Sequence, residues 1–290
     1  MQEFDFYAAN TLDELLRLLA QTGGRVIAGG TDVLVQAQRG VFPASVLVDA
    51  SRVRELRFIR QDGETVHIGA LTTYADMLAS PLLRDAAPAL VAAAATVGAP
   101  QTRARGTLGG NIANASPAGD TLPPLLTLDA TVRLVKLGGE RVLPLAEVLR
   151  GPRQTCLEPG EIIYSVAFRR PPQPTGTAFL KLGNRQGMAI AVVNVAAALT
   201  LGDDGRIGTA RVALGAVAPT PVRSPHAEAV LRGQLLAEEV FQAAARAVLY
   251  DIAPISDVRG SADYRRKAAA RLTARALRLA AAQIAEEVRA

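Results

Sequence analysis

A short segment rich in proline and glycine, RRPPQPTGT at residues 169–177, constrains the fold more than any other feature of the sequence. Its three prolines and one glycine can continue neither a helix nor a sheet. A chain of 290 residues is long enough for two ordinary domains, each with its own core. We therefore predict a first domain at residues 1–172 and a second at residues 176–290.

Strand and helix signals alternate at the start of the first domain. TLDELLRLLAQT at residues 11–22 is typical of an amphipathic helix, and RVIAGG behind it reads as a short strand that runs into a glycine turn. SVLVDAS at 45–51 is a second strand, and RFIRQDGETVHIG at 57–69 reads as a hairpin turning at DG. We predict two α/β subdomains, about residues 1–55 and 56–172.

The second domain opens with strands and ends with helices. AIAVVNVAAALTL is a long apolar strand, and GRIGTARVALGAV follows as its expected partner. Helical patterns cover roughly residues 226–233, 237–251 and 261–288. We predict a small antiparallel sheet packed with a helical bundle, which makes the whole chain α+β.

The supply of metal-binding residues is small. Cys156 is the one cysteine, so the chain can form neither an internal disulfide nor the ligand set of an iron–sulfur cluster. His67 and His226 are the two histidines, which makes a zinc site improbable. If this protein carries out redox chemistry, its cofactor is organic.

Charge and hydropathy limit the location and the partners. The first residues lack the basic start and apolar run of a signal peptide, and no apolar run approaches the ~20 residues that span a bilayer. We therefore expect a cytoplasmic protein. The net charge is +5, and many cations lie in DYRRKAAARLTARALR at 263–278. A solvated helix face explains them better than a surface for nucleic acid.

Two glycine loops are the features that indicate chemistry. VIAGGTDVL at residues 26–34 ends a strand with two glycines and a threonine, and GTLGGNIANASPAGD at 106–120 repeats the pattern within a long loop from Gly98 to Asp120. Glycines let a ligand approach bare N–H groups, which form anion-binding nests. A lone carboxylate such as Asp120 commonly accepts hydrogen bonds from a ribose hydroxyl.

The two loops together predict an extended ligand with a central diphosphate. A tight turn remains the alternative for either loop alone. The sequence contains neither the GxGxxG fingerprint nor the GxxxxGK[ST] loop, so an ordinary Rossmann NAD site and a kinase-type ATP site are both disfavoured.

Several segments resemble one known protein family. AGGTDVLVQAQRG at 28–40 and QTRARGTLGGNIANASPAGDTLPPLLTLDA at 101–130 resemble the two flavin-binding signatures of the medium, FAD-binding subunit of molybdenum hydroxylases. This family includes the carbon monoxide dehydrogenase medium chain and the xanthine dehydrogenase flavoprotein. The likeness continues through FLKLGNRQGMAIAVVNVAAAL at 179–199 and GSADYRRKAAARLTARAL at 260–277, so it covers nearly the whole chain.

The resemblance implies an oxidoreductase subunit that binds FAD, transfers electrons, and has no catalytic residue or metal ligand of its own. In the family a large subunit holds the molybdenum cofactor and a small subunit holds two 2Fe–2S clusters. We expect both as partners, in a dimer of heterotrimers. The FAD would accept electrons from those clusters and pass them to NAD+, a quinone or another acceptor.

The residues that match the family's flavin-binding positions are carried over as a predicted site. The glycine loops would wrap the diphosphate, Asp120 would hold the ribose or adenosine part, and two later residues match positions near the flavin. One departure is Ala189, where many relatives have an aspartate. The predicted FAD-binding residues are Ala28, Gly29, Gly30, Thr31, Asp32, Val33, Thr107, Gly109, Gly110, Asn111, Ser116, Asp120, Lys181 and Ile190.

Two other functions stay open on the sequence. A stand-alone FAD-dependent oxidoreductase would need its own acid–base group, for which the chain offers few candidates. A non-enzymatic module that binds nucleic acid through the basic helix would leave the glycine loops unexplained. Tyr74 and Tyr264 could stack on a flavin, although packing is the favoured interpretation for both.

Overall fold

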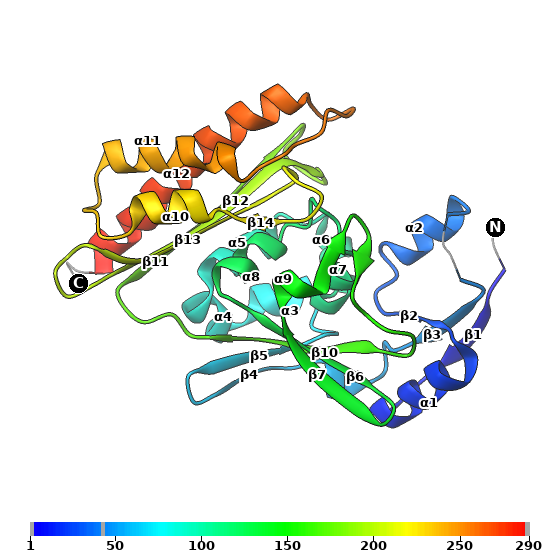
Figure 1. Cartoon of the computed structure of the whole chain (residues 1–290). Helices are drawn as coiled ribbons and strands as arrows, with labels where there is room; N and C mark the ends of the chain where they lie inside the picture. Colours follow the sequence, from blue (N-terminus) through cyan, green and yellow to red (C-terminus); the bar gives the residue numbers. More distant parts are fainter. Residues whose placement is uncertain (1–2, 42–43, 288–290) are drawn as a thin grey trace.

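The structure, a computed structural model, describes residues 3–41 and 44–287 as three larger sheets and one two-stranded sheet, flanked by helices (Figure 1). The larger sheets follow one another along the chain and define an N-terminal lobe (residues 3–50), a middle lobe (54–169) and a C-terminal lobe (175–287). The N-terminal sheet is parallel and the other two larger sheets are antiparallel. The predicted α+β class is confirmed.

The N-terminal lobe is a small parallel sheet with strand order β1-β3-β2. Helix α1 is capped by Thr11, whose side chain accepts a hydrogen bond from the Glu14 N–H, and it buries Leu15, Leu16 and Leu19 against the sheet. The elements are β1 (Asp5–Ala8), α1 (Leu12–Thr22), β2 (Arg25–Ile27), α2 (Val33–Gln38) and β3 (Val46–Asp49).

The middle lobe is an antiparallel sheet with order β4-β5-β10-β6-β7. Its strands are β4 (Ile59–Asp62), β5 (Thr65–Gly69), β6 (Thr131–Lys136), β7 (Gly139–Pro144) and β10 (Ile162–Arg169), with a separate hairpin of β8 (Leu149–Gly151) and β9 (Gln154–Thr155). Its helices are η1 (Arg54–Leu56), α3 (Tyr74–Ala79), α4 (Pro81–Ala86), α5 (Pro88–Ala95), α6 (Pro100–Arg105), α7 (Leu108–Asn114), α8 (Leu122–Thr127) and α9 (Leu145–Val148).

The C-terminal lobe is an antiparallel meander with order β11-β12-β13-β14, followed by helices. Its elements are β11 (Thr175–Gly183), β12 (Ala191–Leu201), β13 (Ile207–Gly215), β14 (Val222–Arg223), α10 (Pro225–Leu231), α11 (Glu238–Ala247), η2 (Val248–Tyr250) and α12 (Ala262–Glu287). The segment 170–174 that leads into this lobe contains no helix or strand. The exact domain limits at 172 and 176 stay a prediction.

Helices cover both faces of the C-terminal sheet (Figure 1). On β12, Val193, Val195 and Leu199 pack with the C-terminal helices, whereas Ala196 packs with α5 of the middle lobe. The strand is buried almost throughout, which explains its run of apolar and small residues. The alternate face of β12 therefore points directly into the middle lobe.

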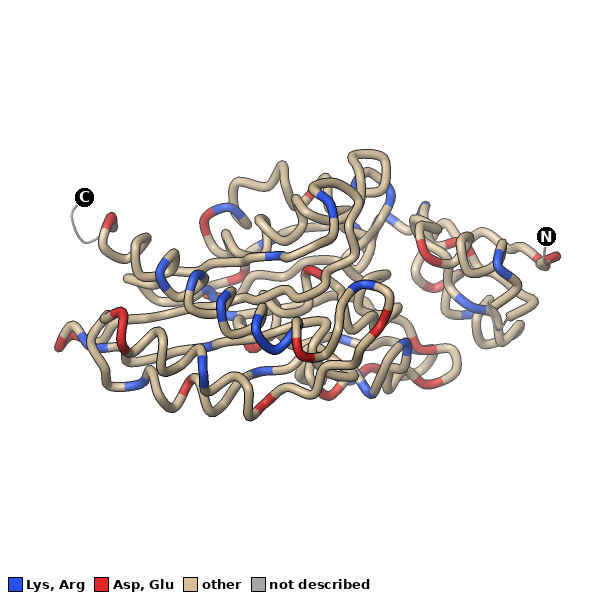
Figure 2. Tube along the Cα trace, turned by 90° about the horizontal axis from the view of Figure 1, so that it is seen from above, with Lys and Arg blue, Asp and Glu red and all other residues tan. Residues whose placement is uncertain are grey.

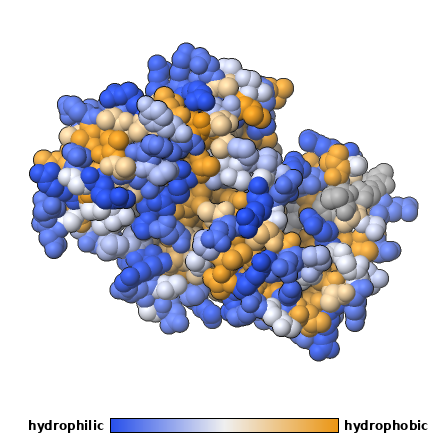
Figure 3. All heavy atoms as spheres, in the orientation of Figure 1, coloured by the Kyte–Doolittle hydropathy of each residue, from blue (hydrophilic) through white to orange (hydrophobic). Residues whose placement is uncertain are grey.

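The surface charges are interspersed (Figure 2). On α12, Arg278 pairs with Glu238 of α11 and Lys267 pairs with Asp263 one turn earlier, as expected for a solvated helix face. Apolar and hydrophilic side chains also alternate over all three lobes on the face seen in Figure 3. In the described part of the chain, no helix combines the length and the hydropathy needed to cross a membrane.

Candidate functional site

The first glycine loop presents a run of free backbone donors. It joins β2 to α2, and Gly30 takes a positive φ of 73° that only glycine adopts without strain. The N–H groups of Gly29, Gly30, Thr31 and Asp32 donate to no residue within 3–41 or 44–287. Successive N–H groups left free in such a turn attract an anion. The structure thus supports an anion-binding role for residues 28–33.

The first loop lies against the segment that contains the second. A Cβ atom on Gly29 would stand 1.8 Å from the Arg105 carbonyl oxygen, so the two backbones touch. Asn114, at the end of α7, donates through Nδ2 to Asp32 Oδ1 at 3.1 Å and accepts from Gln36 Nε2 at 3.3 Å. Residues 82 positions apart are thereby joined, and the two predicted loops form one region.

The second glycine segment is a helix rather than an open loop. Thr107 caps α7, and Gly109, Gly110 and Asn111 lie within it. The N–H groups of residues 108–111 donate to carbonyls of Ala70, Thr72 and Thr107 and to the Thr107 hydroxyl, at 2.9–3.1 Å. Our expectation of free N–H groups here, in a long loop from 98 to 120, is wrong. Gly109 instead allows α7 to pack closely against Ala70, and Gly110 leaves room for the capping hydroxyl of Thr107.

The turn that follows α7 is held by strained backbone. Ala115, Arg153 and Ala216 all have positive φ, at 44°, 60° and 62°. The Arg153 N–H donates to the Ala115 carbonyl at 3.1 Å, and the Ala216 N–H donates to the Pro117 carbonyl at 2.7 Å. Such conformations cost about 1–3 kcal/mol each and cluster at functional sites. Three of them converge on residues 115–117.

Asp120 closes this turn as a buried carboxylate that is 7% exposed. Lys181 Nζ of β11 lies 2.5 Å from Asp120 Oδ2 and also donates to the Thr96 carbonyl at 3.1 Å. Asn194 Nδ2 of β12 donates to Asp120 Oδ1 at 2.9 Å. Burial raises the pKa of Asp120, against the opposing effects of Lys181, Asn194 and Thr96. Asp120 therefore joins the middle lobe to the C-terminal sheet.

The carboxylates of Asp32 and Asp120 both raise the pKa of one neighbour, Tyr74. Burial raises the pKa of Asp32, which Arg153 and the hydrogen bond from Asn114 lower in turn. Burial also raises the pKa of Tyr74 far above its ordinary value, and the charges of Asp32 and Asp120 add to this rise. Tyr74 itself packs in the core of the middle lobe.

The remaining predicted residues lie at the edges of this region. Ser116 Oγ accepts from the Ala118 N–H in the turn before Asp120. Ile190 is 61% exposed, between β11 and β12, and no contact within the described residues ties it to either glycine loop. Tyr264 is half exposed at the start of α12.

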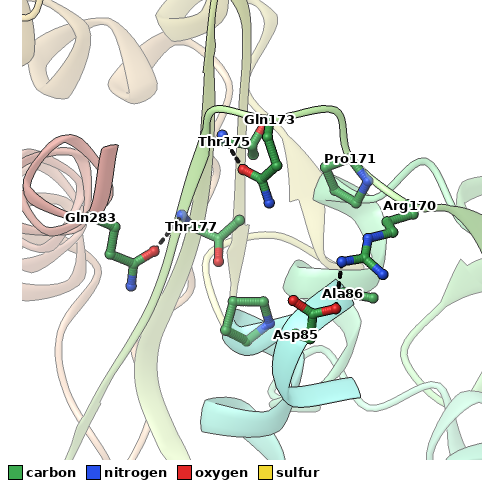
Figure 4. A pocket seen from close by; sticks show the side chains of 9 residues that line it. Asp85, Ala86, Arg170, Pro171, Gln173, Thr175, Thr177 and Gln283 are labelled. Atoms are coloured by element: carbon green, nitrogen blue, oxygen red, sulfur yellow. Dashed lines mark hydrogen bonds and ion pairs between the residues drawn. The ribbon is translucent and has the colours of Figure 1, made fainter. Parts of the chain in front are cut away.

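A small pocket lies elsewhere, beside the segment that links the middle and C-terminal lobes (Figure 4). It is lined by the ion pair of Arg170 with Asp85 and by Thr177, whose N–H donates to Gln283 Oε1 at 2.9 Å. None of the predicted site residues lines it. The described residues also contain no group of three or more His, Cys, Asp or Glu side chains that could hold a metal ion.

Sequence reasoning missed two residues that organise the site, Asn194 and Arg153. Asn194 had a usable signal, because a single polar residue in the apolar run AVVNVAAAL must find a partner when buried. Arg153 had none, since its partner comes from a distant segment. Asn114 is an expected donor of the second glycine segment, but its partners Asp32 and Gln36 could not be predicted, because they lie far away in the sequence.

The strain at Arg153 gives a prediction. We expect Arg153→Gly to be more stable than Arg153→Ala by about 0.5–1 kcal/mol, because glycine accepts a positive φ without the Cβ clash. Urea denaturation of both variants measures the difference. Equal stability would mean that the turn relaxes to a negative φ in the alanine variant.

A protein with a turn of unpaired backbone donors, joined through Asn114 to a second segment that ends in a buried carboxylate, belongs to the class that suits an extended ligand with an anionic centre. Residues 2–171 match the family model described as FAD binding domain in molybdopterin dehydrogenase. Residues 178–280 match that of the CO dehydrogenase flavoprotein C-terminal domain.

Individual relatives agree with the family models. The nicotinate dehydrogenase FAD-subunit of Eubacterium barkeri is 36% identical, with 84% of both chains covered. A putative xanthine dehydrogenase FAD-binding subunit of Escherichia coli is 36% identical over 90% of this chain and 91% of its own. A solved carbon monoxide dehydrogenase structure from Hydrogenophaga pseudoflava superposes with a TM-score of 0.93 at 34% identity, covering 97% and 98% of the two chains.

The chain therefore belongs to the family of FAD-binding subunits of molybdenum hydroxylases, which are oxidoreductases. The predicted family and the predicted cofactor, FAD, are both confirmed.

Proposed function

We propose that this chain is the electron-transfer subunit of a molybdenum hydroxylase complex, with FAD held between the first glycine loop and the turn at 116–120. The observation that carries the proposal is the run of free N–H groups at residues 29–32, in a chain that contains the family's FAD-binding domain. When bound, FAD would take electrons from 2Fe–2S clusters of a partner and pass them to an external acceptor.

The chain's own residues would bind and orient this group. The free N–H groups of residues 29–32 would bind the diphosphate. Asp120, fixed by Lys181 and Asn194, would accept hydrogen bonds from the ribose or adenosine part. Thr107, Gly109, Gly110 and Asn111 would support the site by packing, because their N–H groups or side chains are engaged within the protein.

The partners proposed are a large subunit with the molybdenum cofactor and a small iron–sulfur subunit, assembled as a dimer of heterotrimers in the cytoplasm. Relatives support a multi-subunit assembly, since they are named as one subunit of a larger enzyme, such as the carbon monoxide dehydrogenase medium chain of Hydrogenophaga pseudoflava, 33% identical to this chain. The chain itself has one cysteine and two histidines, too few to hold the clusters.

Purification of the chain alone and together with the products of neighbouring genes tests this function. We expect one FAD per chain in both preparations, and substrate-dependent bleaching of the flavin absorbance only when the partners are present. Absence of FAD after gentle preparation would contradict the proposal. Turnover by the isolated chain would instead identify a stand-alone FAD-dependent oxidoreductase.

A further inference from the structure

Three residues form a row across the C-terminal sheet, facing the middle lobe. Lys181, Asn194 and Gly215 are direct Cα partners on β11, β12 and β13. Side chains of directly opposite residues share one face of a sheet. The row therefore presents an ammonium group, an amide and a bare backbone position to the segment 116–120.

The glycine in this row is required by the amide beside it. A Cβ atom on Gly215 would lie 2.2 Å from Asn194 Oδ1 and 3.1 Å from the Pro117 carbonyl oxygen. The neighbouring residue, Ala216, donates to that same carbonyl. Because glycine has no side chain, both the Asn194 amide and the turn before Asp120 can pack closely against the sheet at this position.

Asn194 is poorly explained by folding alone. It is 0% exposed, and its Oδ1 has no hydrogen-bond partner within the described part of the chain. A buried polar atom left unpaired destabilises a fold, and an apolar residue would fit the surrounding strand better. The side-chain amide of Asn194 donates instead to Asp120, a residue of the middle lobe, at 2.9 Å.

We propose that Asn194 is a positioning residue for FAD: it fixes the orientation of the Asp120 carboxylate, so that the C-terminal sheet sets the affinity of a site built mainly by the other two lobes. The proposal rests on the proposed function. Lys181 holds the second carboxylate oxygen but cannot orient the group alone, because a single ammonium contact leaves the carboxylate free to rotate.

Asn194→Asp tests this without changing the size of the side chain. Two carboxylates at hydrogen-bond distance cannot both ionise easily, so they share a proton until the pH exceeds a raised pKa. The charged and titratable groups that face them are Lys181 from β11 and Tyr74 from α3. Below that pKa, the shared proton replaces the amide hydrogen bond, and above it repulsion displaces Asp120.

We expect the FAD dissociation constant of the Asn194→Asp chain to stay close to that of the wild type near pH 5.5 and to be at least about tenfold weaker at pH 8.5. Fluorescence titration of the full-length chain measures it, with circular dichroism confirming that the protein is folded at each pH. Thr209→Asp is the matched control. It also adds a carboxylate to the sheet, but on β13 at six residues from Gly215, the partner of Asn194, which is roughly 20 Å along the strand. It should bind FAD as the wild type does.

The double variant Asp120→Asn/Asn194→Asp separates positioning from folding. Without FAD, we expect the unfolding midpoint of Asn194→Asp to fall as the pH rises, because the two carboxylates repel each other. The double variant restores an amide–carboxylate pair in reverse, so this fall should disappear while FAD affinity stays weak. Recovered FAD affinity in the double variant, or weakening of Asn194→Asp that does not change with pH, would overturn the inference. A wild-type chain that binds no FAD would refute the proposed function as well.

Discussion

Gly29→Ala is expected to lower the affinity for FAD by at least about 100-fold, equivalent to roughly 3 kcal/mol. The added Cβ would stand 1.8 Å from the Arg105 carbonyl oxygen, far inside van der Waals contact. No side-chain rotation can relieve this clash, because the backbone fixes the position of a Cβ and the Arg105 oxygen is itself a backbone atom. The first loop must therefore retreat from the α6–α7 segment. This movement breaks the bridge through Asn114 and disperses the free N–H groups.

Measuring the FAD-to-protein ratio after gel filtration and the dissociation constant by flavin fluorescence checks this result. Gly139→Ala is the matched control, since no atom lies within 4 Å of its added Cβ and its φ is not positive. That variant should retain full FAD. A Gly29→Ala chain with undiminished FAD content would mean that the first loop does not bind the diphosphate.

The parts of the fold that the sequence predicted well depend on local interactions. The helix at 12–22 was marked by its Thr11 cap and leucine spacing, and both features act within a few residues. The hairpin at 59–69 was marked by DG between alternating residues. The three C-terminal helices and the antiparallel pairing of β12 with β13 were also predicted within a few residues.

The elements that were missed depend on tertiary contacts. Strand β1 is only four residues long and exposes three of them, so its local packing is weak, and it is held by parallel pairing with the distant β3. Helix α7 contains two adjacent glycines, which disfavour helix formation by about 1 kcal/mol each. Burial of Leu108 and Ile112 and the hydrogen bonds to Ala70 and Thr72 outweigh this cost.

The same distinction applies to the site. Glycine pairs and a lone acid marked the two loops because those residue types are informative on their own. Which loop presents free N–H groups was not predictable, since it depends on whether carbonyls such as Thr72 lie opposite the turn. The Asp120–Asn194 contact joins residues 74 positions apart and is set by the register of three strands.

Lys181→Met is expected to destabilise the chain by about 3–5 kcal/mol at pH 8, because it leaves the Asp120 carboxylate buried without its cation. The loss should shrink toward pH 5. Removing Lys181 takes away the main influence that lowers the Asp120 pKa, so this pKa rises further above the unfolded value near 3.8. A raised carboxyl pKa stabilises the fold below the unfolded pKa, and that stabilisation is lost as the pH rises through the folded one.

Urea denaturation at pH 5 and pH 8 measures the change in the free energy of unfolding. Two further variants serve as comparisons. Asp120→Asn/Lys181→Met removes both charges and should recover most of the lost stability, since the penalty comes from an unpaired charge rather than from the missing contact. Lys136→Met breaks the exposed pair with Glu158 and should leave the free energy of unfolding nearly unchanged. If Lys181→Met matched Lys136→Met at both pH values, the Asp120–Lys181 pair could not hold the two lobes together, and the orientation of Asp120 would have to depend on Asn194 alone.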